Sequence, residues 1–381
     1  MVILTRGALI HNGPVRRTAR TLGAAGYEVF VLGGGRKRPV SDADWAEVDG
    51  FKQKVVAVPR LADGGTEDDP YDLARYEAAW WPHVRELSPD VVHSFDVSGL
   101  AVGRRAARDG ARWIYEASEA ARHAGEQPRD LLRRRQVVEH AADADAVITF
   151  SPHVGEVIAG ELGLEQPPPL VHCTPSLDPG PAPRPGLREA AGVAADTPLL
   201  VYVGLVTRRR RLDVVLEALA LLPGVELALA VSSKDPLVLE LRAAAERLGV
   251  SGRVHVVPQV PPESVVPYVA EADVAVNPLE RHPADDISLP NKLFEYLHAG
   301  VPMVVSDSPA MASLVREHAL GEAVPLDDIA GWAAAIRRAL DGPRYRDDAA
   351  RWQALKEEWS WERQAERLLA VYRDLLAAGS R

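Results

Sequence analysis

Cysteine is almost absent from the sequence: Cys173 is the only one, so no disulfide can form within the chain. A lone thiol is typical of proteins that fold in a reducing compartment, and we expect a cytoplasmic protein. Histidines are scattered and do not cluster with cysteines or carboxylates at metal-ligand spacing. We therefore expect no metal ion and no cofactor.

Long apolar runs are also missing. No run reaches the length of about 18 residues that a membrane-spanning helix needs. The chain opens on the strand-like segment Val2, Ile3 and Leu4, without the charged and apolar regions of a signal peptide. We expect neither a spanning helix nor a signal peptide.

Positively charged residues are fewer than negatively charged ones: the chain has 44 lysines and arginines and 54 aspartates and glutamates, which gives a net charge of −10. Proteins that follow nucleic-acid phosphates carry a basic surface, so general nucleic-acid binding is excluded and any phosphate site must be local. Arginines cluster at 16–20, 104–108 and 133–135. A weak peripheral contact with an anionic membrane is one interpretation of these clusters, and solvated helix faces are the simpler one.

The length of 381 residues favours two domains of about 170 to 190 residues each. In the first half, short β-branched runs alternate with amphipathic segments, the pattern of a parallel sheet covered by helices. We expect strands at 2–5, 28–32, 55–58, 91–95, 113–117, 146–150 and 170–173, and helices at 15–25, 71–87, 100–109 and 131–142.

A proline-rich linker, residues 176–186, follows the first half. The alternation then resumes, with strands expected at 199–203, 226–231, 254–257, 274–276, 303–306 and 323–324. We predict an α/β protein of two doubly wound, Rossmann-like domains, 1–175 and 187–358, facing across a cleft at the carboxyl ends of their strands. The final segment, 359–381, is predicted to form a helix that packs across both domains.

Two common nucleotide motifs are missing. The loop after the first strand holds Gly7 and Gly13 but lacks the glycine spacing of a dinucleotide fingerprint, and the only glycine triplet, 33–35, follows the second strand. No P-loop spacing occurs either. The sequence supports neither hydride transfer nor P-loop phosphate chemistry.

The segment 288–302 is the most informative part of the chain. Ser288 is placed to cap a helix over 289–299, Pro290 suits its first turn, and Gly300 suits its end. The free N–H groups and positive dipole end of such a helix favour a phosphate at the turn 288–291.

Two charged residues on this helix point to the same ligand. Lys292 adds a positive charge at the phosphate end, and Glu295 lies one turn on, facing the same side. A carboxylate there is placed to accept hydrogen bonds from hydroxyls of a ligand whose phosphates occupy the helix end. The pattern predicts a nucleotide-sugar site.

A second phosphate-binding candidate follows the strand 199–203. Gly204 lets a ligand approach the backbone, and an arginine from the run 208–211 is suited to clamp a diphosphate. A solvated basic turn is the alternative.

These motifs resemble the donor-binding half of retaining family-4 glycosyltransferases with the GT-B fold. The first half is similar to the same family through residues 15–20, 25–29 and 90–96. The matching motifs of the second half are Tyr202-Val203-Gly204, Ala272-Asp273-Val274 with Asn277-Pro278, and Pro290-Asn291-Lys292-Leu293-Phe294-Glu295-Tyr296 with Ala299-Gly300-Val301-Pro302.

The resemblance implies transfer of a sugar from a UDP-sugar or GDP-sugar to an unidentified acceptor nucleophile. The enzyme would be hexosyltransferase-like, retaining and metal-independent, in bacterial glycoconjugate or natural-product biosynthesis, with a last helix that crosses back to the N-terminal domain. Catalytic roles fall on Arg210 and Lys292, which stabilise the leaving diphosphate. Glu295 would bind the ribose, and donor contacts would come from Gly204, Arg209, Ser288, Leu289, Asn291 and the base-contacting segment at Val257.

The chain departs from the family pattern at four positions. Leu205 stands where many members have an arginine after the first-strand glycine, and Ile287 stands where they have a second glutamate. Asp285 or Asp286 is a candidate to replace that carboxylate. On the acceptor side, Phe95 and Ser118 occupy positions where relatives often have histidine.

The candidates in the N-terminal half follow predicted strands. His93 and Asp96 are predicted at a strand end that faces the ligand, with catalytic roles, and Glu119 is predicted to bind substrate. Gly13 is predicted to admit a phosphate of donor or acceptor, and a plain helix-start glycine is its alternative.

Two further functions fit the fold. A sugar-nucleotide epimerase needs acid and base groups around the sugar ring, and the scarcity of histidine weighs against it. A degenerate relative that binds a sugar nucleotide without transfer agrees with the four departures, whereas Lys292 and Glu295 argue for turnover.

Overall fold

The computed structural model describes residues 1–6, 13–35, 45–58, 73–117, 128–343 and 345–378. The chain forms two compact units, Met1–Cys173 with Arg363–Arg381, and Thr174–Glu362. The last segment thus joins the first unit, although the whole second unit separates it from residue 173.

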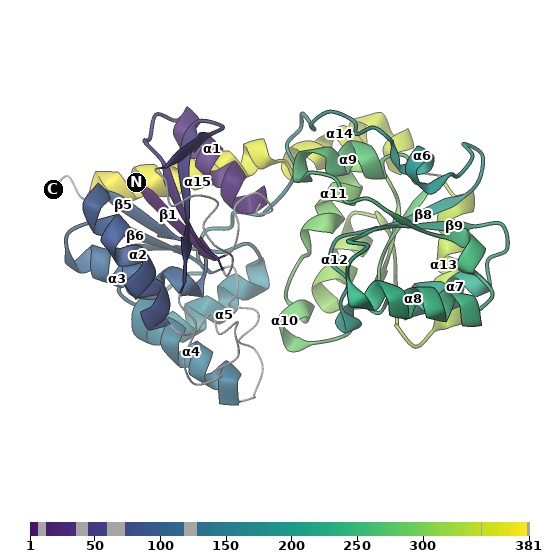
Figure 1. The fold of residues 1–381 in the computed structure, drawn as a ribbon, viewed down its shortest axis with the longest axis horizontal. Helices are drawn as coiled ribbons and strands as arrows, with labels where there is room; N and C mark the ends of the chain where they lie inside the picture. Colours follow the sequence, from purple (N-terminus) through teal and green to yellow (C-terminus); the bar gives the residue numbers. More distant parts are fainter. Residues whose placement is uncertain (7–12, 36–44, 59–72, 118–127, 344, 379–381) are drawn as a thin grey trace. The chain divides into compact units, whose positions relative to one another are not determined.

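The first unit is built on a seven-stranded sheet with the order β3-β4-β2-β1-β5-β6-β7 (Figure 1). All neighbours pair in parallel except β3 and β4. The strands are β1 (Val2–Arg6), β2 (Phe30–Gly35), β3 (Ala46–Val48), β4 (Phe51–Ala57), β5 (Val91–Ser94), β6 (Arg112–Glu116) and β7 (Ala146–Ile148). The helices are α1 (Gly13–Ala24), α2 (Leu73–Leu87), α3 (Leu100–Arg108), α4 (Pro128–Ala141), α5 (Pro152–Leu162) and α15 (Trp361–Ala378).

Six of the strands predicted in this unit are confirmed, and the seventh is wrong. Residues 170–173 make one bridge, between Thr149 and Leu170, and then leave the sheet. The cause is a contact distant in the chain: the backbone N–H of His172 donates to Gln364 Oε1 of α15 at 3.2 Å instead of to a neighbouring strand. The seventh strand of the sheet is instead β3, at the opposite edge, a short and largely exposed strand without an apolar pattern.

The second unit carries a six-stranded parallel sheet with the order β10-β9-β8-β11-β12-β13 (Figure 1). Its strands are β8 (Leu199–Val203), β9 (Glu226–Ala230), β10 (Val254–Val257), β11 (Val274–Asn277), β12 (Met303–Ser306) and β13 (Gly321–Val324). All six were predicted from their β-branched runs, with ends that differ by no more than two residues.

Helices cover both faces of this second sheet. One apolar cluster includes Leu293 of α11 and Met311 of α12, and another includes Leu216 of α7 and Trp332 of α13. The helices are α6 (Leu187–Ala191), α7 (Leu212–Ala220), α8 (Pro236–Arg247), α9 (Val265–Val269), α10 (Pro283–Asp286), α11 (Asn291–Ala299), α12 (Pro309–Glu317), α13 (Ile329–Asp341) and α14 (Ala349–Glu358). The predicted class of two doubly wound α/β domains is confirmed.

The final helix α15 completes the first unit's core. Gln364, Leu368 and Tyr372 recur at helical spacing and are fully buried. The Tyr372 hydroxyl lies 2.8 Å from His93 Nδ1, and its ring lies 5.7 Å from that of Tyr27. Within the described residues, no helix is both long enough and apolar enough to cross a bilayer.

Candidate functional site

The strand order of the second sheet marks one edge as a ligand site. Strand β8 lies between β9 and β11, so the chain runs outward in opposite directions on either side of the β8–β11 pair. In open parallel sheets ligands bind at the carboxyl ends of the strands at such a point. Gly204 follows β8, and Asn277 ends β11, so both loops at this edge carry residues that the sequence had singled out.

The two loops at this edge are joined to each other. The turn after β8 contains a single 3-10 turn, η4 (Arg208–Arg210), and the backbone N–H of Glu280, beyond β11, donates to the Arg209 carbonyl at 2.8 Å. The loops therefore form one structural element, which holds the arginine run against the start of the β11–α11 connection.

Gly204 has a conformation that favours glycine, with φ at +119°. A Cβ at this position would lie 3.3 Å from Lys292 Nζ, tighter than ordinary contact. The glycine therefore gives the backbone its turn and leaves room for the Lys292 ammonium group beside it.

Helix α11 places Lys292 next to that glycine. The helix begins at Asn291, and its N-cap is Pro290 in an extended conformation, without a side-chain cap. The predicted cap at Ser288 and start at residue 289 are therefore wrong by two residues, because Pro290 with φ −60° and ψ 136° holds the chain extended. The predicted end is confirmed: Gly300 is left-handed, with φ at 69°.

The Lys292 ammonium group is buried and, among the described residues, makes no hydrogen bond. Its Nζ lies 3.7 Å from the centre of the Tyr202 ring. Burial, and then the charge of Arg210, lower the pKa of Lys292 well below its ordinary value, while Glu295 opposes this shift. An anion at this point would oppose the shift and favour the charged form of the lysine.

Arg210 differs from the other arginines of its turn. Arg208 pairs with Glu240, Arg211 with Asp213, and Arg209 with Asp285. Arg210 Nη1 is buried, and within the described part of the chain it has no hydrogen-bond partner. Two basic side chains, Arg210 and Lys292, thus interact at the carboxyl edge of the sheet, each with a buried nitrogen that bonds to none of the described residues.

The acidic pair before α11 is held by arginines. Asp285 and Asp286 end the short helix α10, where Asp285 pairs with Arg209 and Asp286 accepts from Arg281 Nε at 2.7 Å. Asp286 also accepts from the Ser308 hydroxyl at 3.2 Å. Both carboxylates therefore lie close to the position of Ile287, where the family pattern has a glutamate.

The remaining donor-site candidates fall on three elements. Ser288 and Leu289 are half-buried in the loop before α11, and Asn291 is exposed at its first turn. Glu295 is half-buried one turn after Lys292. Val257 ends β10 with its side chain in the core, and its predicted place in the base-contacting segment stays a prediction.

His93 is not at the ligand-facing position that the sequence predicted. Its ring is fully buried within β5, with Nδ1 2.8 Å from the Tyr372 hydroxyl and Nε2 3.3 Å from Glu116 Oε2. The second contact has ion-pair distance, although Nε2 makes no hydrogen bond within the described residues. Burial raises the pKa of Glu116, and the contact with His93 opposes the shift. The sequence missed this because α15, which covers the ring, is distant in the chain.

Asp96 has a local structural role. Its carboxylate accepts from the backbone N–H of Arg6 at 2.7 Å and from that of Ser98 at 2.9 Å, where it caps a short helical turn. The carboxylate therefore ties the end of β1 to the turn after β5. A catalytic role for Asp96 stays a prediction.

Two other candidates of the first unit are less informative. Gly13 is buried as the first residue of α1. Glu119 and Ser118 lie outside the described residues. The predicted substrate contacts of Gly13 and Glu119 stay predictions.

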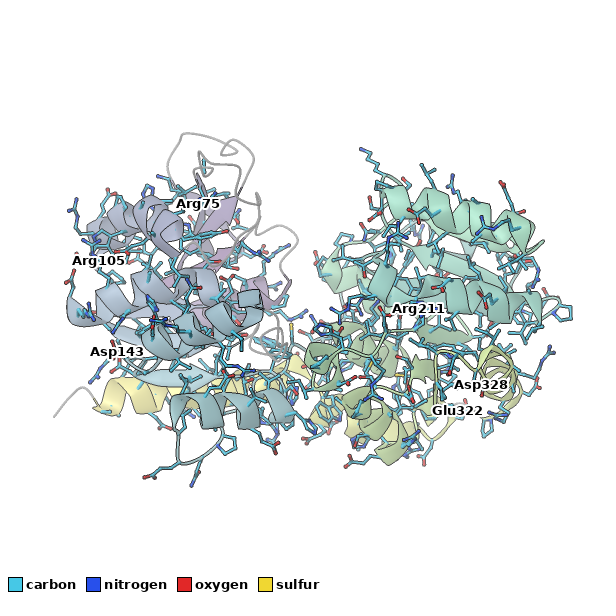
Figure 2. The ribbon with its side chains drawn as sticks, turned by 90° about the horizontal axis from the view of Figure 1, so that it is seen from below. Arg75, Arg105, Asp143, Arg211, Glu322 and Asp328 are labelled. Carbon is cyan, nitrogen blue, oxygen red and sulfur yellow. The ribbon has the colours of Figure 1, made fainter. Side chains whose placement is uncertain are left out.

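The arginine clusters of the first unit are largely ion-paired. Arg104 Nε lies 2.6 Å from Asp143, and Arg105 Nη1 lies 2.8 Å from Glu77. Arg105 and Asp143 both lie on the helical surface in Figure 2. The pairing agrees with the simpler interpretation, a solvated charged face.

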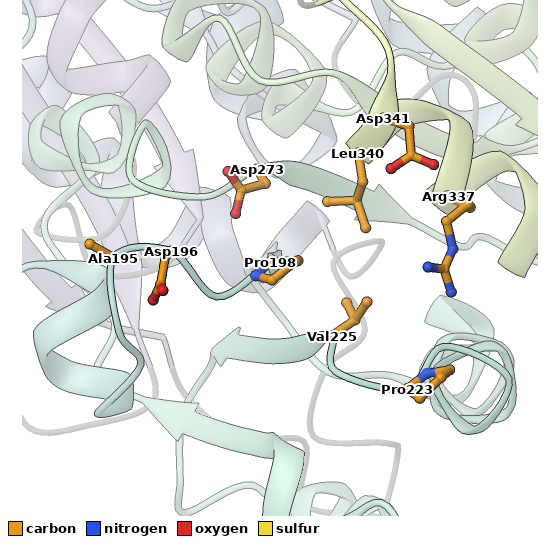
Figure 3. Close-up of a pocket in the computed structure, with 9 residues that line it drawn as sticks. All are labelled: Ala195, Asp196, Pro198, Pro223, Val225, Asp273, Arg337, Leu340 and Asp341. Carbon is orange, nitrogen blue, oxygen red and sulfur yellow. The ribbon is translucent and has the colours of Figure 1, made fainter.

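One small hollow of about 220 Å³ lies in the second unit, away from these residues (Figure 3). Its lining includes Pro198, Val225 and Asp273, each of which directly precedes a strand of the sheet. The hollow is therefore at the amino ends of the strands, opposite to the edge that carries Gly204 and Lys292. Among the described residues, no group of three or more His, Cys, Asp or Glu residues is arranged to hold a metal ion.

Comparisons with known proteins match both halves of the chain. A family profile described as "Glycosyl transferase 4-like domain" matches residues 14–175, and one described as "Glycosyl transferases group 1" matches residues 197–342. Together they span more than half of the chain. A curated relative, the D-inositol 3-phosphate glycosyltransferase of Geodermatophilus obscurus, is 28% identical over 335 residues, which cover 81% of this chain and 72% of the relative.

Solved structures show the same fold at lower identity. The sucrose-phosphate synthase of Thermosynechococcus elongatus matches with a TM-score of 0.80 and 22% identity, over 99% of this chain and all of that one. HepE of Anabaena, in complex with UDP-glucose, matches with a TM-score of 0.70 and 15% identity over 98% of this chain and 100% of that one. The arrangement of two parallel α/β units is thus shared along the full length of these proteins.

Proposed function

The chain belongs to the family-4-like glycosyltransferases with the GT-B fold, and we propose that it transfers a hexose from a UDP-sugar or GDP-sugar to an acceptor hydroxyl with retention of anomeric configuration. Glycosyl transfer from a nucleotide sugar follows from the family. Our proposal adds the class of nucleotide, the stereochemistry of the transfer, the absence of a required metal and the roles of the residues.

The observation that carries the proposal is a pair of buried nitrogens, one from each of two basic side chains, at the β8–β11 edge. Lys292 Nζ and Arg210 Nη1 are buried, and neither has a hydrogen-bond partner among the described residues. Buried charged groups are costly to leave unpaired, so this arrangement favours an anionic ligand that supplies the missing acceptors. A diphosphate offers oxygens for both nitrogens.

The same groups suit the chemistry of the bond that breaks. When the sugar's anomeric carbon separates from the diphosphate oxygen, the bonding electrons leave with the diphosphate, which gains negative charge. Lys292, Arg210 and the free N–H groups at the start of α11 stabilise that charge without rearranging. We propose that these protein cations make a metal ion unnecessary.

Glu295 is proposed to bind the ribose. It lies on α11 one turn after Lys292 and is close enough to influence the pKa of Lys292. A carboxylate accepts hydrogen bonds from two adjacent hydroxyls, and its place on the helix sets the ribose beside the diphosphate. In a retaining transfer the acceptor then attacks from the face that the leaving group vacates, and its proton passes to the leaving phosphate.

The first unit is proposed to bind the acceptor. The curated relative from Geodermatophilus obscurus is named for D-inositol 3-phosphate, so a phosphorylated polyol is the first acceptor class to test. We further propose that the reaction takes place in the cytoplasm, which agrees with a single cysteine in the sequence.

Binding and turnover together test this function. A thermal-shift panel of uridine, guanosine, thymidine and adenosine diphosphates identifies the donor class, because a ligand at a hundredfold excess over its Kd stabilises by about 2.7 kcal/mol. The matching sugar nucleotide is then incubated with and without inositol phosphate and other polyol phosphates. Release of nucleoside diphosphate that depends on acceptor supports transfer. Conversion of the sugar without acceptor identifies an epimerase, and binding without either reaction identifies a non-enzymatic relative.

A further inference from the structure

Tyr202 lies directly against the Lys292 ammonium group. It is the fourth residue of β8, with a fully buried side chain, and its ring centre is 3.7 Å from Lys292 Nζ. The face of an aromatic ring carries partial negative charge and attracts a cation, most strongly where water is excluded. The ring therefore supplies the close electrostatic partner that hydrogen bonds do not supply here.

The Tyr202 hydroxyl acts on the loop that follows. It donates to the Leu205 carbonyl oxygen at 2.6 Å, across the turn made by Gly204. Burial raises the pKa of Tyr202 to about 12, so the hydroxyl keeps its proton and donates throughout the neutral range. One side chain thus holds both the loop where the phosphate is proposed to lie and the cation that binds it.

The other groups around Lys292 do not duplicate this contact. Arg210 repels the ammonium group, and Glu295 attracts it through its charge. Tyr296 accepts from the backbone N–H of Val203 at 3.3 Å, which orients its hydroxyl toward β8. Gly204 offers space without a side chain. The Tyr202 ring face, in contrast, lies in direct contact with Nζ.

We infer that Tyr202 is a positioning residue for donor binding, which holds Lys292 ready for the diphosphate through its ring and holds the Gly204 loop through its hydroxyl. This inference rests on the proposed function and adds a residue to its site. Before the donor binds, no phosphate holds the lysine, so the ring keeps Nζ at the edge of the site until the donor arrives. The two parts of the side chain make separable contributions.

The test uses the full chain and the nucleoside diphosphate that binds best in the panel. Calorimetric titration gives its affinity for the wild type, Tyr202→Phe, Tyr202→Leu, Lys292→Ala and the double variant Tyr202→Leu with Lys292→Ala. Tyr268→Leu is the matched control, because Tyr268 is equally buried in the same unit and lies on α9. Thermal unfolding of each variant reports whether the fold is retained.

Loss of the ring in Tyr202→Leu is expected to weaken binding by about 30-fold beyond the loss in Tyr202→Phe, the factor for a desolvated cation over an aromatic face. Tyr202→Phe keeps the ring and is expected to lose about 3-fold to 10-fold through the Leu205 contact. The double variant is expected to bind more weakly than Lys292→Ala only by the roughly 3-fold to 10-fold of the Leu205 contact, because the ring itself acts through the lysine. Tyr268→Leu is expected to bind as the wild type does, at reduced stability.

Additive losses in the double variant, or equal losses in Tyr202→Leu and Tyr268→Leu, would overturn the inference and leave Tyr202 as a core residue. If Lys292→Ala weakens binding and Tyr202→Leu does not, this inference fails while the proposed function stands. If no nucleoside diphosphate binds to the wild type, or Lys292→Ala binds unchanged, the proposed donor site fails and the inference with it.

Discussion

Arg209 and Asp285 form an ion pair that joins the turn after β8 to the short helix before Ser288. Side-chain exposure of 42% and 26% makes this a partly desolvated contact. The pair directs the Arg209 guanidinium toward the connection between β11 and α11. Among the arginines of that turn, Arg210 is the one with a buried nitrogen that bonds to none of the described residues. The carboxylate near the position of Ile287 thus acts on an arginine of the donor edge.

Replacing Asp285 with alanine should therefore disturb the donor edge. We expect Asp285→Ala to weaken nucleoside-diphosphate binding about 5-fold, because Arg209 loses its fixed orientation. Glu240→Ala, which removes the exposed partner of Arg208, is the control and should bind normally. Titration calorimetry compares the two variants. Tighter binding by Asp285→Ala would instead mean that Asp285 competes with the phosphate for Arg209.

Glu295→Ala should lose recognition of the ribose. The wild type should bind the ribonucleoside diphosphate about 10-fold to 100-fold more tightly than its form without ribose hydroxyls, the range for hydrogen bonds to a charged group. In Glu295→Ala this preference should disappear, whereas the affinity for the form without hydroxyls should stay unchanged. A preference that survives in the variant would assign the ribose to another residue.

His172 should make stability depend on pH. Burial, and then the charge of Arg367, lower the pKa of His172 from 6.5 to about 4, so the folded protein keeps this ring neutral. As pH falls below 6.5, the unfolded chain takes up a proton before the folded protein does. The free energy of unfolding that the neutral ring maintains is therefore fully present above pH 6.5 and is lost progressively toward pH 4. The loss should reach about 3 kcal/mol.

Calorimetric unfolding at a series of pH values measures the His172 effect. His172→Gln should flatten the decline between pH 6.5 and 4, and His153→Gln, which changes an exposed residue of α5, should leave it as in the wild type. An unchanged slope in His172→Gln would show that other groups cause the decline.

Gly103→Ala should destabilise the first unit. A Cβ at Gly103 of α3 would lie 2.0 Å from Trp113 Nε1, which donates to the Ser94 hydroxyl at 3.0 Å. We expect a loss of about 2 to 3 kcal/mol from overpacking. Gly160→Ala is the control: Gly160 lies in α5 with nothing within 4 Å of its added Cβ. That change should stabilise by about 0.5 to 1 kcal/mol. Chemical denaturation of both variants decides the comparison.

Strands and sheet class were predictable because parallel strands buried on both faces have continuous apolar runs. Leu199–Val203 and Met303–Ser306 are buried along their whole length, and their sequences are correspondingly almost all apolar. Ala46–Val48 has no such run, since it lies exposed at the edge of its sheet and is held by backbone pairing to β4. Its existence depends on a neighbour, which a local pattern does not reveal.

The donor edge was predictable in part. Gly204, Lys292 and Gly300 follow from glycine conformation, helix ends and charge, which are local properties. The contact of Tyr202 with Lys292 joins residues that are 90 positions apart, and in the sequence the tyrosine stands out only as part of a strand motif. His93 was misplaced for a similar reason, because Tyr372, its partner, is 279 positions away.

The membership of α15 in the first unit has a consequence for how the protein forms. During synthesis, residues 174–362 are complete and contiguous before the last helix is made. Until the last helix is made, the first unit lacks Leu368 and Tyr372, which fill its core and cover His93. Domains generally fold as units when their chain is available. The unit that is translated first is therefore the one that finishes folding last, because its core is complete only when α15 has emerged from the ribosome.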